Sequence, residues 1–380
     1  MHQALTEPRI SIDFSALSNA AHDPVLLSER LCNIESVSGN EGDIADQVEA
    51  LLRTASHLEV TRIGNNVVAR TMLGKPRRVI IAGHLDTVPV AANLPVVRKV
   101  IDGEDVLWGR GTVDMKSGVA VQLALALELT QPKQDVTWLF YESEEVSADL
   151  NGLGVIERTE PHLLDGDFAI LGEPSNGGVE GGCNGTLRVI ISTSGVAAHS
   201  ARAWMGENAI HKAAPILDIL SKYEPQTVTV EGLDYRESLN AVRVEGGIAG
   251  NVIPDACSVW VNFRFAPSRT GEQALAHVTE LFSGFDVVVD DLSEGAKPGL
   301  DDPLAQEFAS AVLASTGGVP APKYGWTDVA RFSALGISAV NFGPGNAIYA
   351  HKDDEHCPTS QITSCYLALK SWLQTPDTHK

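Results

Sequence analysis

The 380-residue sequence has no apolar run long enough to cross a membrane, and its N-terminus lacks the basic-then-apolar layout of a secretory signal. Cysteine is also scarce, because the five cysteines are scattered and no two of them form a C-x-x-C pair. This spacing argues against a disulfide framework and a cysteine-based zinc knuckle, and it favours reduced thiols. From these absences we expect a cytoplasmic protein that does not bind a membrane.

The sequence also has few positively charged residues: it contains 28 Lys and Arg residues but 49 Asp and Glu residues, so its net charge is −21. Nucleic acid is therefore not expected as a partner, because no basic surface is available to release counterions from phosphates. The rest of the composition is that of a globular protein, with 44% apolar and 20% charged residues. A chain of this length is expected to form two domains.

Strands and helices alternate through the first half of the chain. Short apolar runs, typical of strands buried on both faces, occupy residues 79–82, 136–141 and 168–171. Helical spacing predicts helices over residues 24–57 (with a break at 38–40), 116–129 and 145–158. This alternation predicts an α/β fold, with a mostly parallel sheet covered by helices. The same pattern returns near the C-terminus, as a helix at 301–314, a strand at 339–342 and a helix at 360–373.

The middle of the chain follows a different order. The predicted elements are a strand at 186–193, a helix at 207–220, strands at 241–247 and 257–265, a helix at 271–282 and a strand at 285–290. This β-α-β-β-α-β order is that of a ferredoxin-like α+β sandwich. We therefore predict a catalytic domain of residues 1–182 and 295–380 that carries an inserted domain of residues 183–294.

Acidic and imidazole side chains follow the predicted strands of the first domain. His84 comes directly after the first strand, the pair Glu144 and Glu145 after the second, and Glu173 after the third. Asp114 lies in a glycine-bounded segment just before the helix that begins at residue 116. One such residue is most often a helix cap or a solvated loop residue. Several in order point to a shared site, because ligands bind at the carboxyl edge of such sheets.

These residue types suit a pair of zinc ions. Zinc binds imidazole nitrogen and carboxylate oxygen, and two zincs about 3.5–4 Å apart need a bridging group such as a carboxylate. Zinc also lowers the pKa of a water molecule to about 7, and a carboxylate that is not a ligand must then accept its proton. An adjacent pair such as Glu144 and Glu145 can divide the tasks of base and ligand.

At this point the sequence resembles the dinuclear zinc aminoacylase and carboxypeptidase superfamily. The resemblance covers nearly the whole chain and includes the segments 83–89, 109–118, 144–145, 171–174 and 251–254 and the late His351. It implies that Asp114 bridges two zinc ions and that Glu144 is the general base. It also implies that the remaining ligands are His84 and Glu173 for one zinc, and Glu145 and His351 for the other. Cobalt is expected to be able to substitute for zinc.

The resemblance implies two further features around these ligands. Asp86 would orient the His84 imidazole through its carboxylate, which fixes the tautomer. The peptide bond between Asp114 and Met115 would be cis, as is frequent in the superfamily.

The last ligand has two candidates, because His351 and His356 lie close together. The superfamily's late motif is a histidine followed four residues later by a glutamate. That spacing fits His351 and Glu355, so we favour His351.

The inserted domain resembles the lid and dimerisation domain of the superfamily, which implies a homodimer. His199 matches the histidine that polarises the scissile carbonyl in the partner's active site, although it could be a surface histidine near a turn. Asn251 and Arg264 match residues that contact the carboxylate end of the substrate, and the planar fork of Arg264 suits that role. Arg264 could equally be a solvated strand residue.

Within the superfamily, the segments 180–188, 324–336 and 340–345 resemble the actinobacterial succinyl-diaminopimelate desuccinylases. This implies a small N-acyl amino acid substrate, N-succinyl-LL-2,6-diaminopimelate, with Thr327 and Asn346 in the succinyl pocket. Cys183, Asn184 and Gly250 depart from the proteobacterial pattern, so the contacts to the succinyl carboxylate stay open. The alternatives are an N-acetylornithine deacetylase or a dipeptidase or carboxypeptidase of the same superfamily, or a relative that binds without catalysis.

Overall fold

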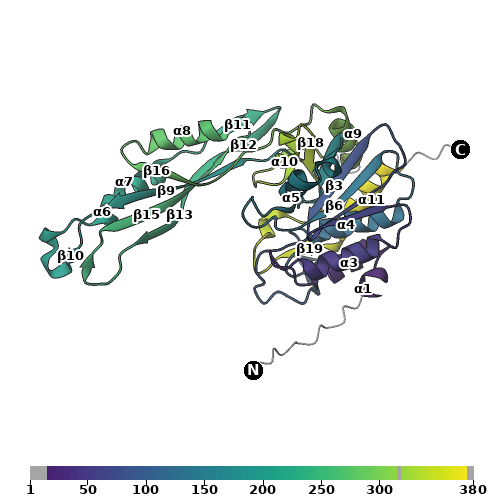
Figure 1. Cartoon of the computed structure of the whole chain (residues 1–380), viewed down its shortest axis with the longest axis horizontal. Coiled ribbons are helices and arrows are strands. Elements are labelled where there is room, and N and C mark those ends of the chain that lie inside the picture. The colour runs from purple at the N-terminus through teal and green to yellow at the C-terminus, as the bar shows by residue number, and fades with distance from the viewer. Residues whose placement is uncertain (1–14, 315–317, 375–380) are drawn as a thin grey trace, which may run out of the picture. The chain divides into compact units, whose positions relative to one another are not determined.

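The computed structural model describes residues 15–314 and 318–374. It divides into two compact units (Figure 1). Unit 1 comprises residues 1–179, 304–319 and 341–380, and unit 2 comprises residues 180–303 and 320–340. The sequence pattern instead predicts one insertion of residues 183–294, and those domain limits stay a prediction.

Unit 1 is built on a sheet whose centre is parallel. Strand β3 (Arg78–His84) lies between β6 (Asp135–Tyr141) and β7 (Phe168–Leu171) and pairs in parallel with both. Strands β2 (Asn66–Arg70) and β1 (Glu59–Ile63) extend the sheet antiparallel beyond β6. Every residue of β6 and β7 is buried, as is normal for strands covered on both faces. The predicted parallel arrangement is therefore observed in the centre of this sheet.

Helix α4 (Lys116–Glu128) is the central helix of unit 1. It packs against β3 and β6 and also against α2 (Pro24–Cys32), α3 (Gly42–Leu52) and α11 (Thr359–Leu373). Residues 116–126 are all buried, which explains why this helix is apolar on every side. Because α4 begins two residues after Asp114, this packing also restricts the position of that carboxylate.

Two predicted helices of unit 1 differ from the observed ones. The break predicted at residues 38–40 is observed, but it is wider than predicted, because α2 ends at Cys32 and α3 begins at Gly42. The helix predicted from residue 145 begins only at Gly152, as α5 (Gly152–Thr159). The Asn151 side chain caps α5 by accepting from the backbone N–H groups of Leu153 and Gly154. The residues between β6 and this cap form a loop, and its backbone N–H groups bind side chains instead.

Unit 2 contains a four-stranded antiparallel sheet in the order β13-β15-β9-β16. These strands are β9 (Gly185–Ser194), β13 (Ser238–Gly246), β15 (Ala256–Phe265) and β16 (Asp286–Ser293). Alternate residues of β9 and β15 are buried, so one face of the sheet forms the core with α7 (Ala214–Lys222) and α8 (Gly271–Leu281). The order is that of the predicted ferredoxin-like sandwich.

Several short elements had no strong sequence signal. In unit 1 they include α1 (Ser15–Ser18) and the sheet of β4 (Val97–Ile101), β5 (Glu104–Trp108) and β19 (His356–Pro358). In unit 2 they include α10 (Val329–Ala334) and the strand pairs β10 (Ala198–His199) with β14 (Val252–Ile253), β11 (Thr227–Val230) with β12 (Leu233–Arg236), and β8 (Glu180–Gly181) with β17 (Ala321–Pro322). The helix predicted over residues 207–220 is observed as α6 (Ala209–Lys212) followed by α7. At the unit boundaries lie α9 (Pro303–Leu313) and β18 (Ser338–Asn341).

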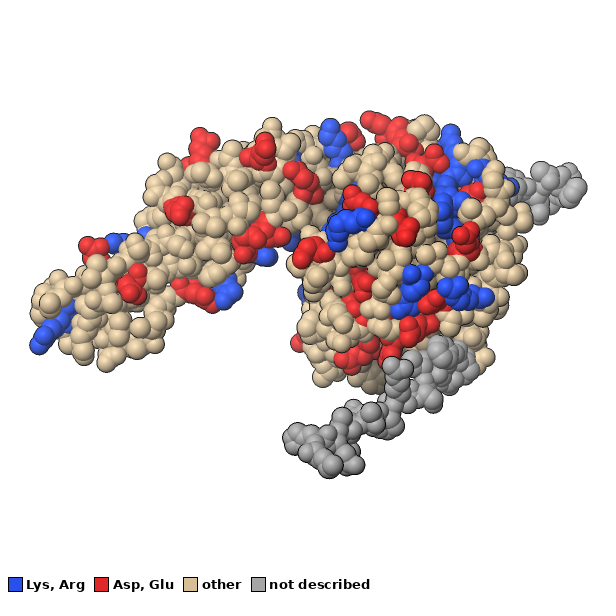
Figure 2. All heavy atoms as spheres, in the orientation of Figure 1, with Lys and Arg blue, Asp and Glu red and all other residues tan. Residues whose placement is uncertain are grey.

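None of the helices in the described part of the chain is both long and apolar enough to span a membrane. On the face drawn in Figure 2, Lys and Arg side chains lie beside Asp and Glu side chains instead of forming a broad basic surface. This distribution agrees with the net charge of −21.

Candidate metal centre

The carboxyl ends of the central strands in unit 1 bring the predicted ligands together. His84 is the last residue of β3, Glu145 follows β6, and Glu173 follows β7. Asp114 precedes α4, and the peptide bond between Asp114 and Met115 is cis, as the resemblance implied. Among the described residues, His84, Asp114 and Glu145 place their donor atoms within 4.8 Å of one another. The predicted edge of the sheet therefore does carry a cluster of side chains that could hold a metal ion.

Asp114 lies between two imidazoles. Its Oδ1 atom is 3.1 Å from Nε2 of His84, and its Oδ2 atom is 3.3 Å from Nε2 of His351. Nε2 of His351 is also 2.9 Å from Oε1 of Glu145, and Nε2 of His84 is 3.9 Å from Oε1 of Glu173. The two oxygens of Asp114 thus face separate pairs of donors, which is the arrangement that a bridging carboxylate requires.

These distances fit the donor spacing around zinc. Tetrahedral coordination with bonds near 2.1 Å places neighbouring donor atoms about 3.4 Å apart. The contacts between Asp114, the two imidazoles and the two glutamates range from 2.9 to 3.9 Å. Imidazole nitrogen and carboxylate oxygen are also ligands that zinc accepts readily. Both the geometry and the chemistry of the residues therefore suit a pair of divalent ions.

The electrostatics of the cluster favour bound cations. Hydrogen bonds to Asp114 and Glu145 raise the pKa of His351 to about 10. Burial alone would lower the pKa of His84, but its hydrogen bonds to Asp114 and Asp86 hold it well above its usual range. Burial, followed by the charge of Asp114, raises the pKa of Glu145. The carboxylates thus attract positive charge strongly, and a metal must displace the imidazole protons to bind.

Asp86 contacts both His84 and the loop after β6. Nδ1 of His84 lies 3.0 Å from the backbone oxygen of Asp86 and 3.5 Å from its carboxylate. The buried carboxylate accepts hydrogen bonds from the backbone N–H groups of Glu144 (3.0 Å) and Glu145 (3.1 Å) and from the hydroxyl of Ser38 (2.7 Å). Asp86 therefore positions the predicted base and a predicted ligand, and its backbone rather than its carboxylate makes the shorter contact to His84.

Glu41 continues this support, and no sequence pattern marked it. Its buried Oε1 atom accepts hydrogen bonds from the backbone N–H groups of Gly39 (2.9 Å) and Ser143 (3.2 Å). Ser143 has a φ of +60°, a strained conformation for a residue with a side chain. Three consecutive N–H groups, of residues 143, 144 and 145, thus donate to the carboxylates of Glu41 and Asp86. Only the fold brings residue 41 to this loop, so local spacing gave no signal.

The two histidine candidates near the C-terminus occupy different environments. The His351 ring contacts Asp114 and Glu145, as described above. His356 lies in β19, where its Nδ1 atom is 2.7 Å from the backbone oxygen of Asp354 and its ring centroid is 4.2 Å from that of Tyr349. His356 is therefore used in packing, and the geometry favours His351 as the ligand.

The predicted lid residues lie in unit 2. His199 is exposed, and its Nδ1 atom accepts a hydrogen bond from the backbone of Ala201 at 3.1 Å. The pairing of β10 with β14 places His199 opposite Val252, so it brings the exposed Asn251 close to His199. Within unit 2, these two predicted site residues are neighbours.

The remaining predicted substrate contacts lie on one strand and in two separate loops. Arg264 lies on β15 between Ser238 and Thr186 of the adjacent strands, and burial lowers its pKa. Thr327 is buried, and its backbone oxygen accepts from the thiol of Cys183 at 3.6 Å. Asn346 lies in unit 1, where its side chain accepts from the backbone of Ile348 at 3.1 Å.

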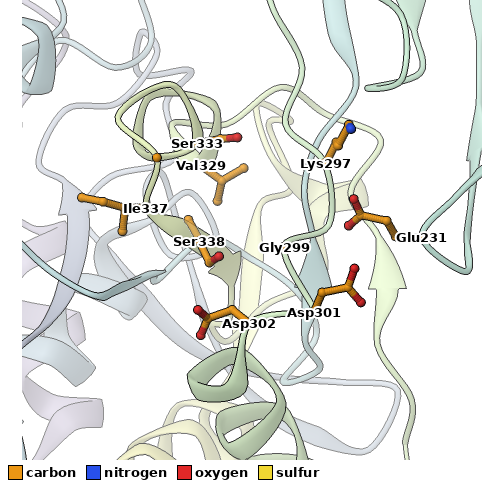
Figure 3. A pocket seen from close by; sticks show the side chains of 11 residues that line it. Glu231, Lys297, Gly299, Asp301, Asp302, Val329, Ser333, Ile337 and Ser338 are labelled. Carbon is orange, nitrogen blue, oxygen red and sulfur yellow. The ribbon is translucent and has the colours of Figure 1, made fainter. Parts of the chain in front are cut away.

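Unit 2 also contains a cavity of about 250 Å³ (Figure 3). Its polar lining consists mainly of the carboxylates of Glu231, Asp301 and Asp302 and the ammonium group of Lys297, and Val329 contributes an apolar wall. No histidine or cysteine lines it. The cavity therefore lacks the mixed donors found in unit 1, so the cluster around Asp114 is the stronger candidate for a metal centre.

Comparison with known proteins gives a consistent result. The model of peptidase family M20/M25/M40 matches residues 80–375. A putative succinyl-diaminopimelate desuccinylase of Mycobacterium tuberculosis is 51% identical over 92% of this chain and 98% of that protein. A succinyl-diaminopimelate desuccinylase of Corynebacterium glutamicum is 47% identical over 92% of this chain and 96% of that protein. A dinuclear metal-binding M20 peptidase of Bacillus subtilis has a similar fold, with a TM-score of 0.64, 17% identity and coverage of 93% of this chain and 98% of that one.

Proposed function

The chain belongs to peptidase family M20/M25/M40, and from this premise we propose that it hydrolyses N-succinyl-LL-2,6-diaminopimelate to succinate and LL-2,6-diaminopimelate. The observation that carries the substrate is the 51% identity, over 92% of the chain, to a protein named as this desuccinylase. The family and fold predicted from the sequence are thereby confirmed. The reaction belongs to the synthesis of diaminopimelate and lysine.

The cluster around Asp114 supports a two-metal hydrolase. His84 and Glu173 would hold one zinc ion, Glu145 and His351 the other, and Asp114 would bridge them; cobalt would be able to replace zinc. When bound, the metals would polarise the scissile carbonyl and increase the acidity of a water molecule.

Glu144 would act as the general base of this reaction. Its backbone is fixed by the Asp86 carboxylate, and it is adjacent to the predicted ligand Glu145. It would accept a proton from the attacking water and deliver that proton to the leaving amine.

Unit 2 would act as the lid and dimerisation domain. His199 would donate a hydrogen bond to the developing oxyanion in the partner's active site. Asn251 and Arg264 would hold the carboxylate end of the substrate, and Thr327 and Asn346 would line the succinyl pocket. This assignment rests on the resemblance of residues 195–204 and 251–254 to the lid motifs of the family and on the exposure of His199 and Asn251.

The surface of unit 2 supports a homodimer. Strand β13 is an edge strand, and Val242 and Val244 on it are 58% and 51% exposed. Between and beside them, Arg243 and Glu245 form an ion pair with each other, so this edge has no unbalanced charge there that would repel a second copy. The opposite edge, β16, carries Asp286, Asp290 and Asp291, which would repel a second copy. We therefore propose a cytoplasmic homodimer formed through β13.

The substrate assignment is tested with purified, zinc-loaded protein. Succinyl-diaminopimelate, N-acetylornithine and a set of dipeptides would be compared by kcat/KM. We expect the succinylated substrate to be preferred by at least a hundredfold. Turnover of N-acetylornithine or dipeptides in its place would assign the chain to a deacetylase or dipeptidase of the same family. A chain that binds zinc and turns over none of the three would be a binding relative.

A further inference from the structure

We propose that Arg110 and Glu355 form a positioning pair that sets the geometry of Asp114 and His351, so that one of the two metals depends on this pair much more than the other does. The inference rests on the two-metal site of the proposed function. It assigns a role to two buried residues that are not themselves predicted to touch metal or substrate.

Glu355 holds the backbone of the bridging ligand. Its Oε1 atom accepts hydrogen bonds from the backbone N–H groups of Val113 (2.9 Å) and Asp114 (3.1 Å). Its own backbone oxygen accepts from the N–H of Gly109 at 2.9 Å. The segment from 109 to 114 is therefore tied to residue 355 at both of its ends. A change at Glu355 would release the backbone that carries the Asp114 carboxylate.

Arg110 connects Glu355 to the segment that carries His351. Its Nη1 atom donates to Oε2 of Glu355 at 2.8 Å and to the backbone oxygen of Lys352 at 3.2 Å, and its Nε atom donates to the backbone oxygen of Pro89 at 3.2 Å. The Arg110 and Glu355 side chains are 3% and 1% exposed, so water cannot replace these contacts. One guanidinium thus joins three segments around the metal centre.

The segment at His351 needs such support. His351 has a φ of +63°, a left-handed conformation that is strained for a residue with a side chain. Its ring is also half-exposed, so packing alone does not hold it. The contact from Arg110 to the oxygen of the next residue, Lys352, is therefore an anchor for the His351 backbone.

The other half of the metal centre is anchored differently. His84 ends the buried strand β3, and its Nδ1 atom bonds the backbone oxygen of Asp86. Glu173 follows the buried strand β7, and the preceding Gly172 donates its N–H to Ala82 of β3 at 2.9 Å. These ligands are held by the sheet itself. Asp114 would serve both metals, whereas His351 would serve only one, so loss of the Arg110–Glu355 pair should weaken the metal held by Glu145 and His351 much more than the one held by His84 and Glu173.

The test is metal binding to the full-length chain with Glu355→Gln, measured by calorimetry with zinc and by absorption spectroscopy with cobalt. The variant keeps an acceptor for the N–H groups of Val113 and Asp114 but loses the charge that faces Arg110. Outer partners of metal ligands typically change affinity by about 10–100-fold. We expect the first ion to bind within about threefold of wild type, the second at least tenfold more weakly, and the cobalt spectrum of the second site to change.

Asp135→Asn is the matched control. Asp135 is also a buried carboxylate that accepts from two backbone N–H groups, of Leu73 (2.9 Å) and Lys75 (2.8 Å), and faces an arginine, Arg78, at 3.8 Å. It lies at the opposite end of β6 from the metal centre. We expect this variant to be less stable but to bind two ions with wild-type affinities.

Arg110→Lys provides a second variant in case Glu355→Gln does not fold. It keeps the positive charge but cannot reach several acceptors with a planar fork, so the same selective loss is expected. Wild-type binding of both ions to these variants would overturn the proposal, as would equal weakening of both ions. Failure of the desuccinylase assignment would be recognised separately, because the wild-type chain would then bind two ions but not cleave the succinylated substrate.

Discussion

At the scale of single residues, neighbouring carboxylates of this chain have different environments. Glu145 contacts His351, whereas Glu142, three residues earlier, accepts hydrogen bonds from the backbone of Asn65 and the side chain of Asn66, both at 3.1 Å. Glu144 is held through its backbone by Asp86. All three follow the same strand, so only their contacts distinguish a structural residue from the proposed ligand and base.

Glu144→Gln should retain two zinc ions and lose most turnover. The amide cannot accept the proton of the attacking water, and general bases typically contribute about 10²–10⁴-fold to the rate. The measurements are kcat and the zinc content of the purified variant. Glu142→Gln is the control, and its kcat is expected to stay within about twofold of wild type. A Glu144→Gln variant with more than a tenth of the wild-type kcat would mean that another group is the base.

The five cysteines should be unreactive in the native protein. All five are buried, and burial raises the pKa of Cys32 and Cys365 to about 12 and of Cys183 to about 11. Because the thiolate is the reactive form, an aromatic disulfide reagent at pH 8 should modify less than one thiol per chain. All five should react after addition of guanidinium chloride. Rapid native labelling of two or more thiols would contradict the burial seen here.

At the scale of elements, the contact between α4 and the end of β7 needs a glycine. A Cβ atom on Gly118 would lie 2.0 Å from the backbone oxygen of Gly172, the residue before Glu173. The helix and the segment carrying a predicted ligand therefore approach backbone to backbone.

Gly118→Ala should lower the free energy of unfolding by about 2 kcal/mol or more, because overpacking of a buried contact costs about 1–3 kcal/mol and here backbone must move. It should also weaken zinc binding by displacing Glu173. Chemical unfolding and zinc titration measure the two effects. Gly42→Ala is the control: it is also helical, and its Cβ would meet no atom within 4 Å. If Gly118→Ala behaved like this control, α4 would not be in such close contact.

Asp135 is the first residue of β6, and its carboxylate binds the backbone of the segment that leads into β3. Burial alone would raise the pKa of this carboxyl, but hydrogen bonds from Leu73, Thr71 and Lys75 lower it overall. A group with a lowered folded pKa stabilises the fold above its unfolded pKa of about 3.9, and this contribution is lost as pH falls through the folded pKa.

Asp135→Asn should therefore be less stable than wild type by about 1–3 kcal/mol at pH 7, the usual value of hydrogen bonds to a charged group. The difference should shrink as pH is lowered from about 5 to 3, where wild type loses the contribution of the ionised carboxylate. Urea unfolding at several pH values measures it. A difference that stays constant over this range would show that the carboxylate is not ionised in the folded protein.

At the scale of the whole molecule, the proposed homodimer predicts that substitutions at the two edges of the unit 2 sheet have different effects on dimerisation. Val244→Lys on β13 would place a charge in the proposed interface, so the dimer should dissociate and kcat should fall at least tenfold, because His199 would no longer reach its partner. Light scattering after size exclusion measures the mass. Val288→Lys on β16, where Val288 is 52% exposed, should change neither property. If only the Val288→Lys variant dissociated the dimer, the interface would lie at β16 and not at β13.

The sequence predicted the order of the main elements and most of the proposed site. Buried strands were predictable because β3, β6 and β7 are largely apolar runs, and three of the five candidate ligands, His84, Glu145 and Glu173, lie at or within four residues of their carboxyl ends. The start of α5 was predicted wrongly, because the N–H groups of the loop after β6 bind the distant carboxylates of Glu41 and Asp86 instead of forming a helix. Local periodicity contains no information about partners that are far apart in the chain.

What the sequence determined by itself is the set of donors, since residue type decides which atoms can bind zinc, and motif order identifies the family. The tertiary structure alone decided how these donors are held. It placed each oxygen of Asp114 against a different imidazole, separated His351 from His356, and brought Glu355 to the backbone of Asp114 across more than 240 positions of the chain. The reason is physical: bonding depends on distances in space, and these are fixed only when the buried strands and α4 pack together.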